Sequence, residues 1–423
     1  MFVAHFHQAR WPPIDANHET DAPGSAKGRD VDFRDPKSVV QLTKTLLELD
    51  FGIKIELPPD RLCPPVPNRH SYILWLKDLL DTSSYDEPGR KRTGMDIGTG
   101  ASCIYPLLGS WRADIDAESL KWARRNVEIN GLSSRINVVA RSADSALIPL
   151  DELGLEAVDF TMTNPPFYES EEDLLSSAKK KKRPPHTACT GSSTEMVTPG
   201  GELAFVVGLL KESCALRTRI QWYSAMFGFL SNLVDFIGQL RAYGVTNYAV
   251  TEFVQGNKTR RWAVAWSFQP MRPAQHVARG TRSALSRNIL PRVTEAEVIS
   301  FEMPRSIGGF AATMTGAIES LDLISWSWDT QAYEGTGRAA DKVWARAWRR
   351  RKKREQQGAD GDEDGAASQS EPRCMFGFKV WIRVSVKGVV VVGCRWVEGF
   401  DATAFESFGG FLQSTAKAAA GLQ

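Results

Sequence analysis

The sequence holds few of the residues that build metal centres, disulfide frameworks or membrane spans. It has six cysteines and six histidines in 423 residues, with no C-x-x-C pair, so no metal site is expected. Scattered cysteines fit a reducing compartment better than a secreted disulfide scaffold. The longest apolar run, residues 203–210, is far too short to cross a bilayer. The first ten residues also lack the basic start and apolar core of a signal peptide. A soluble protein of the nucleus or cytoplasm, with no membrane partner, is therefore expected.

Charge of one sign is also scarce over the whole chain, because 52 Lys and Arg against 50 Asp and Glu leave a net charge of +2. Basic residues are instead gathered in two runs, and an acidic patch at 360–364 follows the second. A single run of this kind is more often solvated surface than a binding site. The first run also fits a nuclear-localisation patch, a motif that is common by chance. The runs are Lys179, Lys180, Lys181, Lys182 and Arg183, and then Arg349, Arg350, Arg351, Lys352, Lys353 and Arg354.

The length and a hydrophobic content of 42% predict two globular domains. Residues 1–32 are polar and rich in Pro, Gly and Asp, which indicates a flexible N-terminal arm. Between 33 and 269, strands and helices alternate, and this pattern predicts an α/β domain with a doubly wound, Rossmann-like sheet. Its last two strands, joined by a short turn, form an antiparallel hairpin at one edge. The predicted strands are one that ends at 96–97 and those at 136–140, 157–163, 222–229, 246–254 and 261–268; the predicted helices are 37–50, 70–82, 102–108, 117–130, 201–217 and 231–243.

A change of composition near residue 270 indicates a second domain. Residues 270–295 are predicted as a linker, and 296–423 as a smaller α+β domain with a disordered acidic loop near 356–372. Its clearest feature is a hairpin of two strands at 376–386 and 389–397. A further strand is predicted at 296–302, and helices at 308–325, 340–355 and 402–418.

The most informative motif is Asn164-Pro165-Pro166-Phe167, directly after the apolar strand at 157–163. An Asn side chain carries a donor and an acceptor, so its oxygen can hold an exocyclic amine. Proline nitrogens cannot donate a hydrogen bond, so the Pro165 carbonyl is free to accept from the same amine. The Phe167 ring offers a stacking surface. A lone motif of this kind is as often a proline-rich turn as a site.

A glycine turn upstream strengthens the interpretation of a site. Gly98 and Gly100 follow a strand and let the backbone approach a ligand closely. No Lys follows at the spacing of a phosphate-binding loop. An acidic residue that holds the ribose hydroxyls is expected about 20 residues on, and Asp114 and Asp116 are the candidates. Asp116 has an equally good alternative role as a helix N-cap.

The two motifs together point to methyl transfer from S-adenosylmethionine to a planar nitrogen, with Asn164, Pro165, Pro166 and Phe167 as the catalytic group. Such a transfer needs alignment more than acid–base help, and alignment can contribute on the order of 7–11 kcal/mol. An adenine must be single-stranded or flipped out to reach such a pocket. Both basic runs would then hold RNA phosphates. Trp344 and Trp348 either stack on bases or pack as core of an amphipathic helix.

These motifs resemble the family of RNA adenine-N6 methyltransferases that includes methyltransferase-like protein sixteen and the bacterial RlmF enzymes. The resemblance covers most of residues 33–268 and is weaker at 344–354 and 396–399, which are similar to the family's RNA-binding extension. It implies methylation of adenine in U6 small nuclear RNA or a similar hairpin, with S-adenosylmethionine as cofactor. By matching position it places the cofactor contacts. These are Arg69, Gly98, Asp114, Ser145 and Asn164, together with Gly100 of the glycine turn. The matching stretches are 33–36, 46–52, 65–73, 96–109, 164–167, 200–203, 251–253 and 261–268.

Two departures from the family pattern keep other functions open. Only residues 110–113 separate Gly109 from Asp114, which is short for the second strand of such a sheet. The N-terminal arm keeps the pattern only at residues 9–13. One alternative is therefore a non-catalytic RNA-binding protein with a damaged cofactor pocket. Another is a methyltransferase of a different planar amine or amide, such as DNA adenine or protein glutamine. A monomer is expected.

Overall fold

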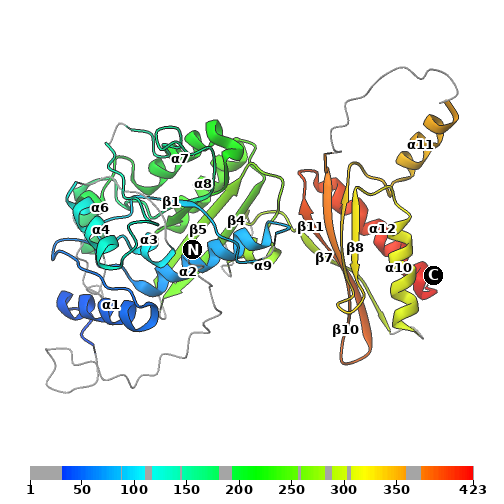
Figure 1. Ribbon diagram of the computed structural model, residues 1–423, viewed down its shortest axis with the longest axis horizontal. Coiled ribbons are helices and arrows are strands. Elements are labelled where there is room, and N and C mark those ends of the chain that lie inside the picture. The colour runs from blue at the N-terminus through cyan, green and yellow to red at the C-terminus, as the bar shows by residue number, and fades with distance from the viewer. Residues whose placement is uncertain are drawn as a thin grey trace. The chain divides into compact units, whose positions relative to one another are not determined.

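The computed structural model divides the chain into two compact units (Figure 1). The N-terminal unit comprises residues 1–81, 86–269 and 277–291, and the C-terminal unit comprises 82–85, 270–276 and 292–423. In the part of the chain that the structure describes, no helix has the length and apolar character needed to span a membrane. The described residues are 31–422 without 87, 110–116, 143–144, 181–192, 256–258, 282–287, 303–305 and 359–372.

The N-terminal unit is built on a six-stranded sheet in the order β1-β2-β3-β5-β4-β6. Strands β1, β2 and β3 run parallel, and β5 pairs antiparallel with both β3 and β4. The predicted antiparallel hairpin is thus present, and the short β6 pairs with its outer strand β4. The strands are β1 (Gly94–Ile97), β2 (Val158–Thr163), β3 (Ile220–Phe227), β4 (Asn247–Gln255), β5 (Thr259–Ser267) and β6 (Arg279–Gly280).

Helices cover both faces of this sheet, as a doubly wound fold requires. On one face, α7 and α8 pack their apolar residues on alternating positions of β3 and β5, with Leu209, Phe236 and Trp266 fully buried. On the other face lies α2, whose Tyr72 hydroxyl is 2.8 Å from Ser224 Oγ on β3. The helices are α1 (Pro36–Phe51), α2 (Val66–Thr82), α3 (Ile104–Gly109), α4 (Ala117–Ile129), α5 (Glu171–Lys180), α6 (Ser193–Met196), α7 (Gly201–Leu216), α8 (Leu230–Ala242) and α9 (Gln275–Ala278), with a 3-10 turn, η1 (Arg217–Arg219).

The C-terminal unit is a five-stranded antiparallel sheet in the order β7-β11-β10-β9-β8 (Figure 1). Its core is aromatic: Phe376, Phe378 and Phe408 lie within 5.6 Å of one another by ring centroids. Helices α10 and α12 supply the apolar residues that cover this sheet face. The strands are β7 (Glu295–Glu302), β8 (Ser325–Asp329), β9 (Glu334–Ala339), β10 (Phe376–Val384) and β11 (Val389–Glu398), and the helices are α10 (Ile307–Glu319), α11 (Arg346–Gly358) and α12 (Ala402–Ala420).

The predicted fold class is confirmed, with its Rossmann-like α/β sheet and smaller α+β domain, but several elements differ. Residues 136–140 belong to no strand, because they make no ladder hydrogen bonds with a described strand. The predicted helix at 308–325 ends at Glu319, and β8 begins at Ser325. Strands β8 and β9 were both missed, although Trp326 and Trp328 alternate with polar residues as a half-buried strand does.

The predicted linker at 270–295 is not a simple connection. It contributes α9 and β6, and it is divided between the two units. The predicted arm lies outside the described residues except for residues 31–32, and so does the acidic loop beyond Gly358. Residues 110–116, where the sequence is short of the family pattern, also lie outside the described part of the chain.

Candidate active site

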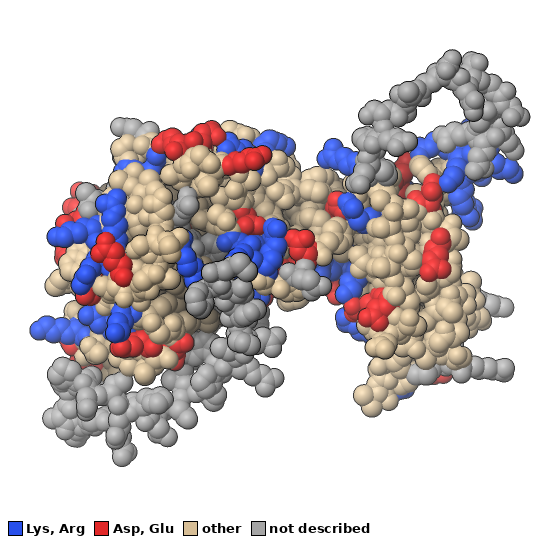
Figure 2. Space-filling view, viewed as in Figure 1, with Lys and Arg blue, Asp and Glu red and all other residues tan. Residues whose placement is uncertain are grey.

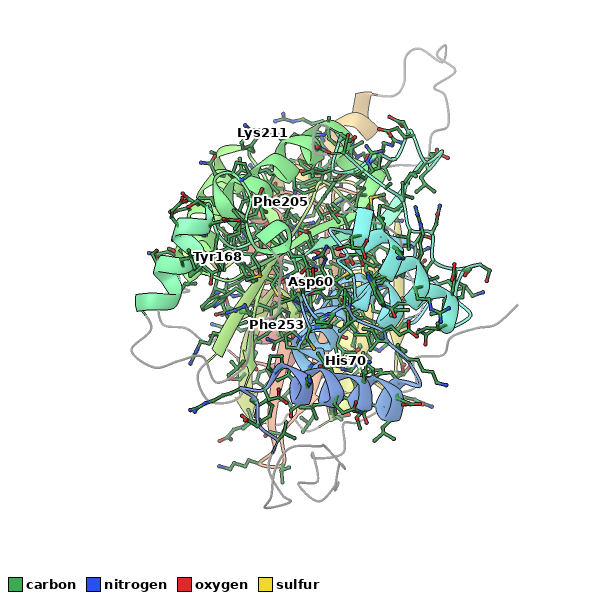
Figure 3. All side chains as sticks on the ribbon, turned by 90° about the vertical axis from the view of Figure 1, so that its left-hand side faces the viewer. Asp60, His70, Tyr168, Phe205, Lys211 and Phe253 are labelled. Atoms are coloured by element: carbon green, nitrogen blue, oxygen red, sulfur yellow. The ribbon has the colours of Figure 1, made fainter. Side chains whose placement is uncertain are left out.

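A cavity of about 720 Å³ lies at the carboxyl ends of β1 and β2. In parallel α/β sheets this edge is where ligands bind. The cavity is lined by the glycine turn after β1, the motif after β2, and segments from α2, α4 and the chain before α7. Its lining residues are Leu62, Pro64, Arg69, Met95, Ile97, Gly98, Thr99, Gly100, Ser102, Ile104, Tyr105, Ser119, Val139, Arg141, Ser142, Ser145, Ala146, Leu147, Pro149, Leu153, Thr163, Asn164, Pro165, Pro166, Glu195, Val197, Thr198 and Phe205. In Figure 3, Phe205 on α7 is labelled above Tyr168, the residue that follows the motif.

Strand pairing brings the glycine turn and the NPPF motif together. Ile97 and Thr163 are partners in the parallel ladder, and the Thr163 hydroxyl donates to the Ile97 carbonyl at 2.7 Å. Gly98 follows Ile97 and Asn164 follows Thr163, so these two residues lie side by side at the cavity. Gly98 has φ +78°, and a Cβ built on it would have no atom within 4 Å. Its face toward the cavity is open for a ligand.

Asn164 presents a buried acceptor to this cavity. Its Oδ1 atom is buried and, among the described residues, has no hydrogen-bond partner. The Thr99 hydroxyl, on the glycine turn, is in the same state. Leaving a buried polar atom unsatisfied costs about 1–3 kcal/mol, so such atoms beside a cavity indicate that a ligand satisfies them. Pro165 and Pro166 complete this wall.

Phe167 lies outside the cavity lining. The Arg261 guanidinium sits 5.3 Å from its ring centroid, and a Cβ on Gly228 would come within 2.9 Å of the ring. Burial lowers the pKa of Arg261, and repulsion from Arg69 lowers it further. Two cations thus lie close to the motif.

A buried carboxylate holds the turn against which Phe167 packs. Glu202 is fully buried at the start of α7. It accepts hydrogen bonds from the Gly228 and Phe229 amides at 2.7 and 3.0 Å, and from Asn232 Nδ2. Burial raises the pKa of Glu202, and these hydrogen bonds oppose that effect. The wall behind Phe167 is therefore fixed by α7 and by the turn after β3.

Arg69 is a buried cation of the cavity lining. It is 6% exposed, and its Nη1 donates to the Tyr105 hydroxyl at 2.7 Å. Burial raises the pKa of Tyr105 to about 12, while Arg69 lowers it. Tyr105 therefore stays neutral and accepts from Arg69 without neutralising its charge. A positive charge kept in a cavity suits an anionic ligand group.

The loop that carries Ser145 is held by hydrogen bonds to Glu212 on α7. Glu212 accepts hydrogen bonds from the Leu147 and Ile148 amides at 2.9 and 3.0 Å. The Ser145 hydroxyl lies 2.7 Å from that of Ser142. Both serines line the cavity.

The structure gathers most of the predicted site residues but not all. Arg69, Gly98, Gly100, Ser145, Asn164, Pro165 and Pro166 line one cavity. Asp114 and residues 181–183 lie outside the described residues, and Lys179 and Lys180 end helix α5. The predicted RNA contacts Arg349, Arg350, Arg351, Lys352 and Lys353 lie on α11 in the C-terminal unit.

Three residues at the site were missed by the sequence analysis: Tyr105, Arg261 and Glu195. Tyr105 and Arg261 stand in stretches that resemble the family, so their positions were visible but their roles were not. Glu195 carried no signal, since nothing in its sequence neighbourhood places it opposite the glycine turn. Among the described residues no group of three or more His, Cys, Asp and Glu could hold a metal ion.

The residues present fit S-adenosylmethionine. An open glycine turn, a buried cation and unsatisfied acceptors at one sheet edge define an S-adenosylmethionine-dependent methyltransferase with a Rossmann-like sheet. A family model described as RNA methyltransferase matches residues 22–270. The chain belongs to this RNA methyltransferase family, and the resemblance predicted from the sequence is confirmed.

Relatives and solved structures agree with that assignment. The U6 small nuclear RNA (adenine-(43)-N(6))-methyltransferase of Schizosaccharomyces pombe is 35% identical over 392 residues, 91% of this chain and 94% of that protein. The RNA N(6)-adenosine-methyltransferase METTL16 of Homo sapiens is 42% identical over 56% of this chain and 44% of its own length. The crystal structure of the hMettl16 catalytic domain in complex with MAT2A 3′UTR hairpin 1 is 41% identical, with a TM-score of 0.52, over 58% of this chain and 85% of that one.

Proposed function

We propose that this protein transfers a methyl group from S-adenosylmethionine to the N6 amine of an adenine in structured RNA, with U6 small nuclear RNA as substrate. The observation that carries the proposal is the buried, unsatisfied Oδ1 of Asn164, beside the open glycine turn. The relative that aligns along nearly its whole length is named for adenine-N6 methylation of U6 RNA. U6 as the substrate also favours the nucleus as the place of action.

The site acts mainly by alignment. Asn164 Oδ1 accepts a hydrogen bond from the adenine amine and fixes the direction of the nitrogen lone pair. The Pro165 carbonyl, on the cavity wall, is assigned to accept a hydrogen bond from the second N–H of that amine. S-adenosylmethionine, when bound, supplies the methyl group. Arg69, Gly98, Gly100 and Ser145 are the residues proposed to hold it, and no general base is needed for the proposal.

Contacts with neighbouring residues limit the ring surface that Phe167 can offer for stacking. Arg261 is close to its ring and Gly228 is packed on it. An adenine that leaves its helix has to be held by stacking and hydrogen bonds. We therefore assign Phe167 and the Arg261 guanidinium together to the planar surface that the flipped base meets, since guanidinium planes stack on bases as rings do.

Helix α11 is the proposed RNA contact in the C-terminal unit. Arg349, Arg350 and Lys353 are exposed on it, and Lys353 lies four residues after Arg349 and three after Arg350, so it shares a face with both. Arg351 and Lys352 are instead tied to Asp341 and Asp322 by ion pairs of 2.6 Å. Figure 2 shows the basic side chains of this helix projecting from the unit. Exposed cations on one helix face suit a run of phosphates.

The tryptophans of this segment do not share one role. Trp344 is buried against Phe376 and Phe408, and its Nε1 donates to Ser407 Oγ at 2.7 Å. It is core, so the alternative of base stacking is wrong for this residue. Trp348 is partly buried beneath Arg351, whose guanidinium lies 4.4 Å from the ring centroid. The proposal therefore places phosphate contacts, and no base stacking, on α11.

The test of the proposed reaction is incubation of the purified protein with methyl-labelled S-adenosylmethionine and a U6-like hairpin, followed by nucleoside analysis. Label is expected in N6-methyladenosine. The Asn164→Ala variant should lose roughly 100-fold or more in rate, as when other groups that stabilise a reacting centre are removed. Gln239→Ala, on the exposed face of α8, is the matched control. Label in DNA adenine or in glutamine, or full activity in Asn164→Ala, would contradict the proposal.

The proposed contact of α11 is tested by RNA affinity at several salt concentrations. The double variant Arg349→Ala/Arg350→Ala should weaken binding to all sequences and lower the slope of log K against log salt by about 2. Lys387→Ala, an exposed cation on the β10–β11 turn, should leave the slope unchanged. An equal loss in both variants would indicate only a general charge effect and remove α11 as a specific contact.

A further inference from the structure

Glu195 places a carboxylate at the glycine turn from a distant part of the chain. It lies on α6, after the segment that follows the NPPF motif, and it lines the cavity. Its Oε2 accepts a hydrogen bond from the Leu62 amide at 2.9 Å. Its Oε1 lies 3.6 Å from the position that a Cβ on Gly100 would take. The carboxylate is therefore anchored by the Leu62 amide and lies against the side of Gly100 that a side chain would fill.

The same cavity contains a charge of the opposite sign. Arg69 is buried in its lining, and its Nη1 partner is the neutral Tyr105 hydroxyl. The methionine end of S-adenosylmethionine carries an α-carboxylate and an α-ammonium on one carbon. Taking both groups out of water is costly unless each meets an opposite charge or hydrogen bonds. A cavity with one cation and one anion in its wall suits that pair.

We propose that Glu195 binds the α-ammonium of the cofactor's methionine end, with Arg69 serving the α-carboxylate. The inference concerns the cofactor alone, and it stands whether or not U6 RNA is the substrate. The glycine turn is where the backbone comes closest to the ligand, and Glu195 faces that turn. The Leu62 hydrogen bond holds its carboxylate in place before the ligand arrives.

This contact also links the cofactor to the acceptor side of the site. The segment next to Glu195 is bonded to the residue after the NPPF motif: the Tyr168 amide donates to the Met196 carbonyl, and the Thr198 amide donates to the Tyr168 carbonyl, each at 3.0 Å. Tyr168 and Val197 form a parallel bridge. A cofactor held by Glu195 therefore steadies the backbone that positions Phe167.

The test measures binding by calorimetry with three ligands that differ only at the methionine end. These are S-adenosylhomocysteine, its decarboxylated analogue, which keeps the amine, and 5′-methylthioadenosine, which lacks both charged groups. Glu195→Gln keeps an oxygen that can accept from the Leu62 amide but removes the charge. This variant should lower the affinity for the first two ligands roughly 10- to 100-fold, as expected when a charge-assisted hydrogen bond is lost. Affinity for 5′-methylthioadenosine should stay within about twofold, since that ligand has no amine to lose.

A purely structural role gives a different pattern. If Glu195 only ties α6 to Leu62, the variant weakens all three ligands by the same factor, and the proposal fails. It also fails if S-adenosylhomocysteine binds Glu195→Gln as it binds the original protein. Glu195→Asp keeps the charge and should recover part of the affinity for the two amines. Glu171→Gln, exposed at the start of α5, is the matched control for loss of one negative charge near this segment.

Discussion

Glycine serves different purposes in the two units. At Gly98 in the N-terminal unit, no atom lies within 4 Å of the position of a missing Cβ. At Gly337 on β9, that position is 2.4 Å from the ring of Phe378. The first glycine leaves space that the protein does not fill, and the second leaves space that an aromatic ring of the same unit takes. Because Gly98 also lines the cavity, the space beside it is available to a ligand.

Two buried acceptors, one in each unit, differ in a similar way. Asn164 Oδ1 lies beside the cavity without a partner in the described chain. Glu398, 8% exposed in the C-terminal unit, accepts from Arg338 Nε and from the Tyr85 hydroxyl, each at 3.1 Å. The site keeps an acceptor available for a ligand, whereas the packed sheet satisfies its carboxylate internally. Substitutions at the site should thus change binding, and those in the aromatic core should change stability.

The largest expected effect is on the aromatic core. Phe378 is fully buried against Phe376 and Phe408, so Phe378→Ala should lower the free energy of unfolding by about 3–5 kcal/mol. Hydrogen exchange of the full chain should quicken in β9 and β10 and stay unchanged in β1 and β2. Phe400→Ala, 49% exposed in the same unit, is the matched control. An equal increase in hydrogen exchange in both sheets would contradict the distinction between the two units.

An intermediate effect is expected from the same substitution at the two glycines. Gly337→Ala forces a Cβ into the Phe378 ring and should cost about 1–3 kcal/mol of stability, with affinity for S-adenosylhomocysteine unchanged. Gly98→Ala has room for its Cβ but a φ of +78°, so it should cost only about 1–2 kcal/mol. Its affinity for S-adenosylhomocysteine should fall roughly tenfold or more, because the methyl group takes space at the turn.

Chemical unfolding and calorimetry on both variants check this pair. The comparison breaks if Gly337→Ala loses cofactor affinity as much as Gly98→Ala does. It also breaks if Gly98→Ala binds the cofactor normally, because the open space beside the turn would then have no part in binding.

The sequence predicts the two strand ends that form the site better than its other details. Gly98 and Asn164 were expected at one edge because both follow buried strands, and the Ile97–Thr163 pairing places them together. Glu195 was not expected at this place. A tertiary contact with Leu62 brings it there, and local patterns hold no information on such a contact. Arg261 was quoted only as part of a matching stretch, since alternation along β5 does not tell which face Phe167 occupies.

The C-terminal unit shows where periodicity was misread. Its β8 alternates Trp326 and Trp328 with small polar residues, a pattern typical of a half-buried strand, yet no strand was predicted there. Gly335 and Gly337 obscure β9 in the sequence, since isolated glycines weaken a strand. The rings of Trp326 and Phe378 fill the space over these two glycines, so the cost is offset by packing that only the fold reveals.

The smallest expected effect concerns the cap of the helix that covers the aromatic core. Asp401 is the N-cap of α12, and hydrogen bonds led by that from the Thr403 hydroxyl hold its pKa at about 2. Since the folded pKa is depressed, the stabilisation by the charge is complete above the unfolded pKa of about 3.9 and is lost as pH falls toward 2. Its side chain is 40% exposed, so screening limits this charge effect to well under about 1 kcal/mol.

Asp401→Asn keeps the cap and should remove the fall in stability between about pH 4 and 2 that this carboxylate causes, whereas Asp401→Ala should cost about 1 kcal/mol at pH 7. Urea unfolding at pH 4 and pH 2 measures the charge effect, and urea unfolding at pH 7 measures the loss of the cap. A loss in Asp401→Ala as large as that in Phe378→Ala would mean that the cap, and not the aromatic packing, sets the stability of this unit.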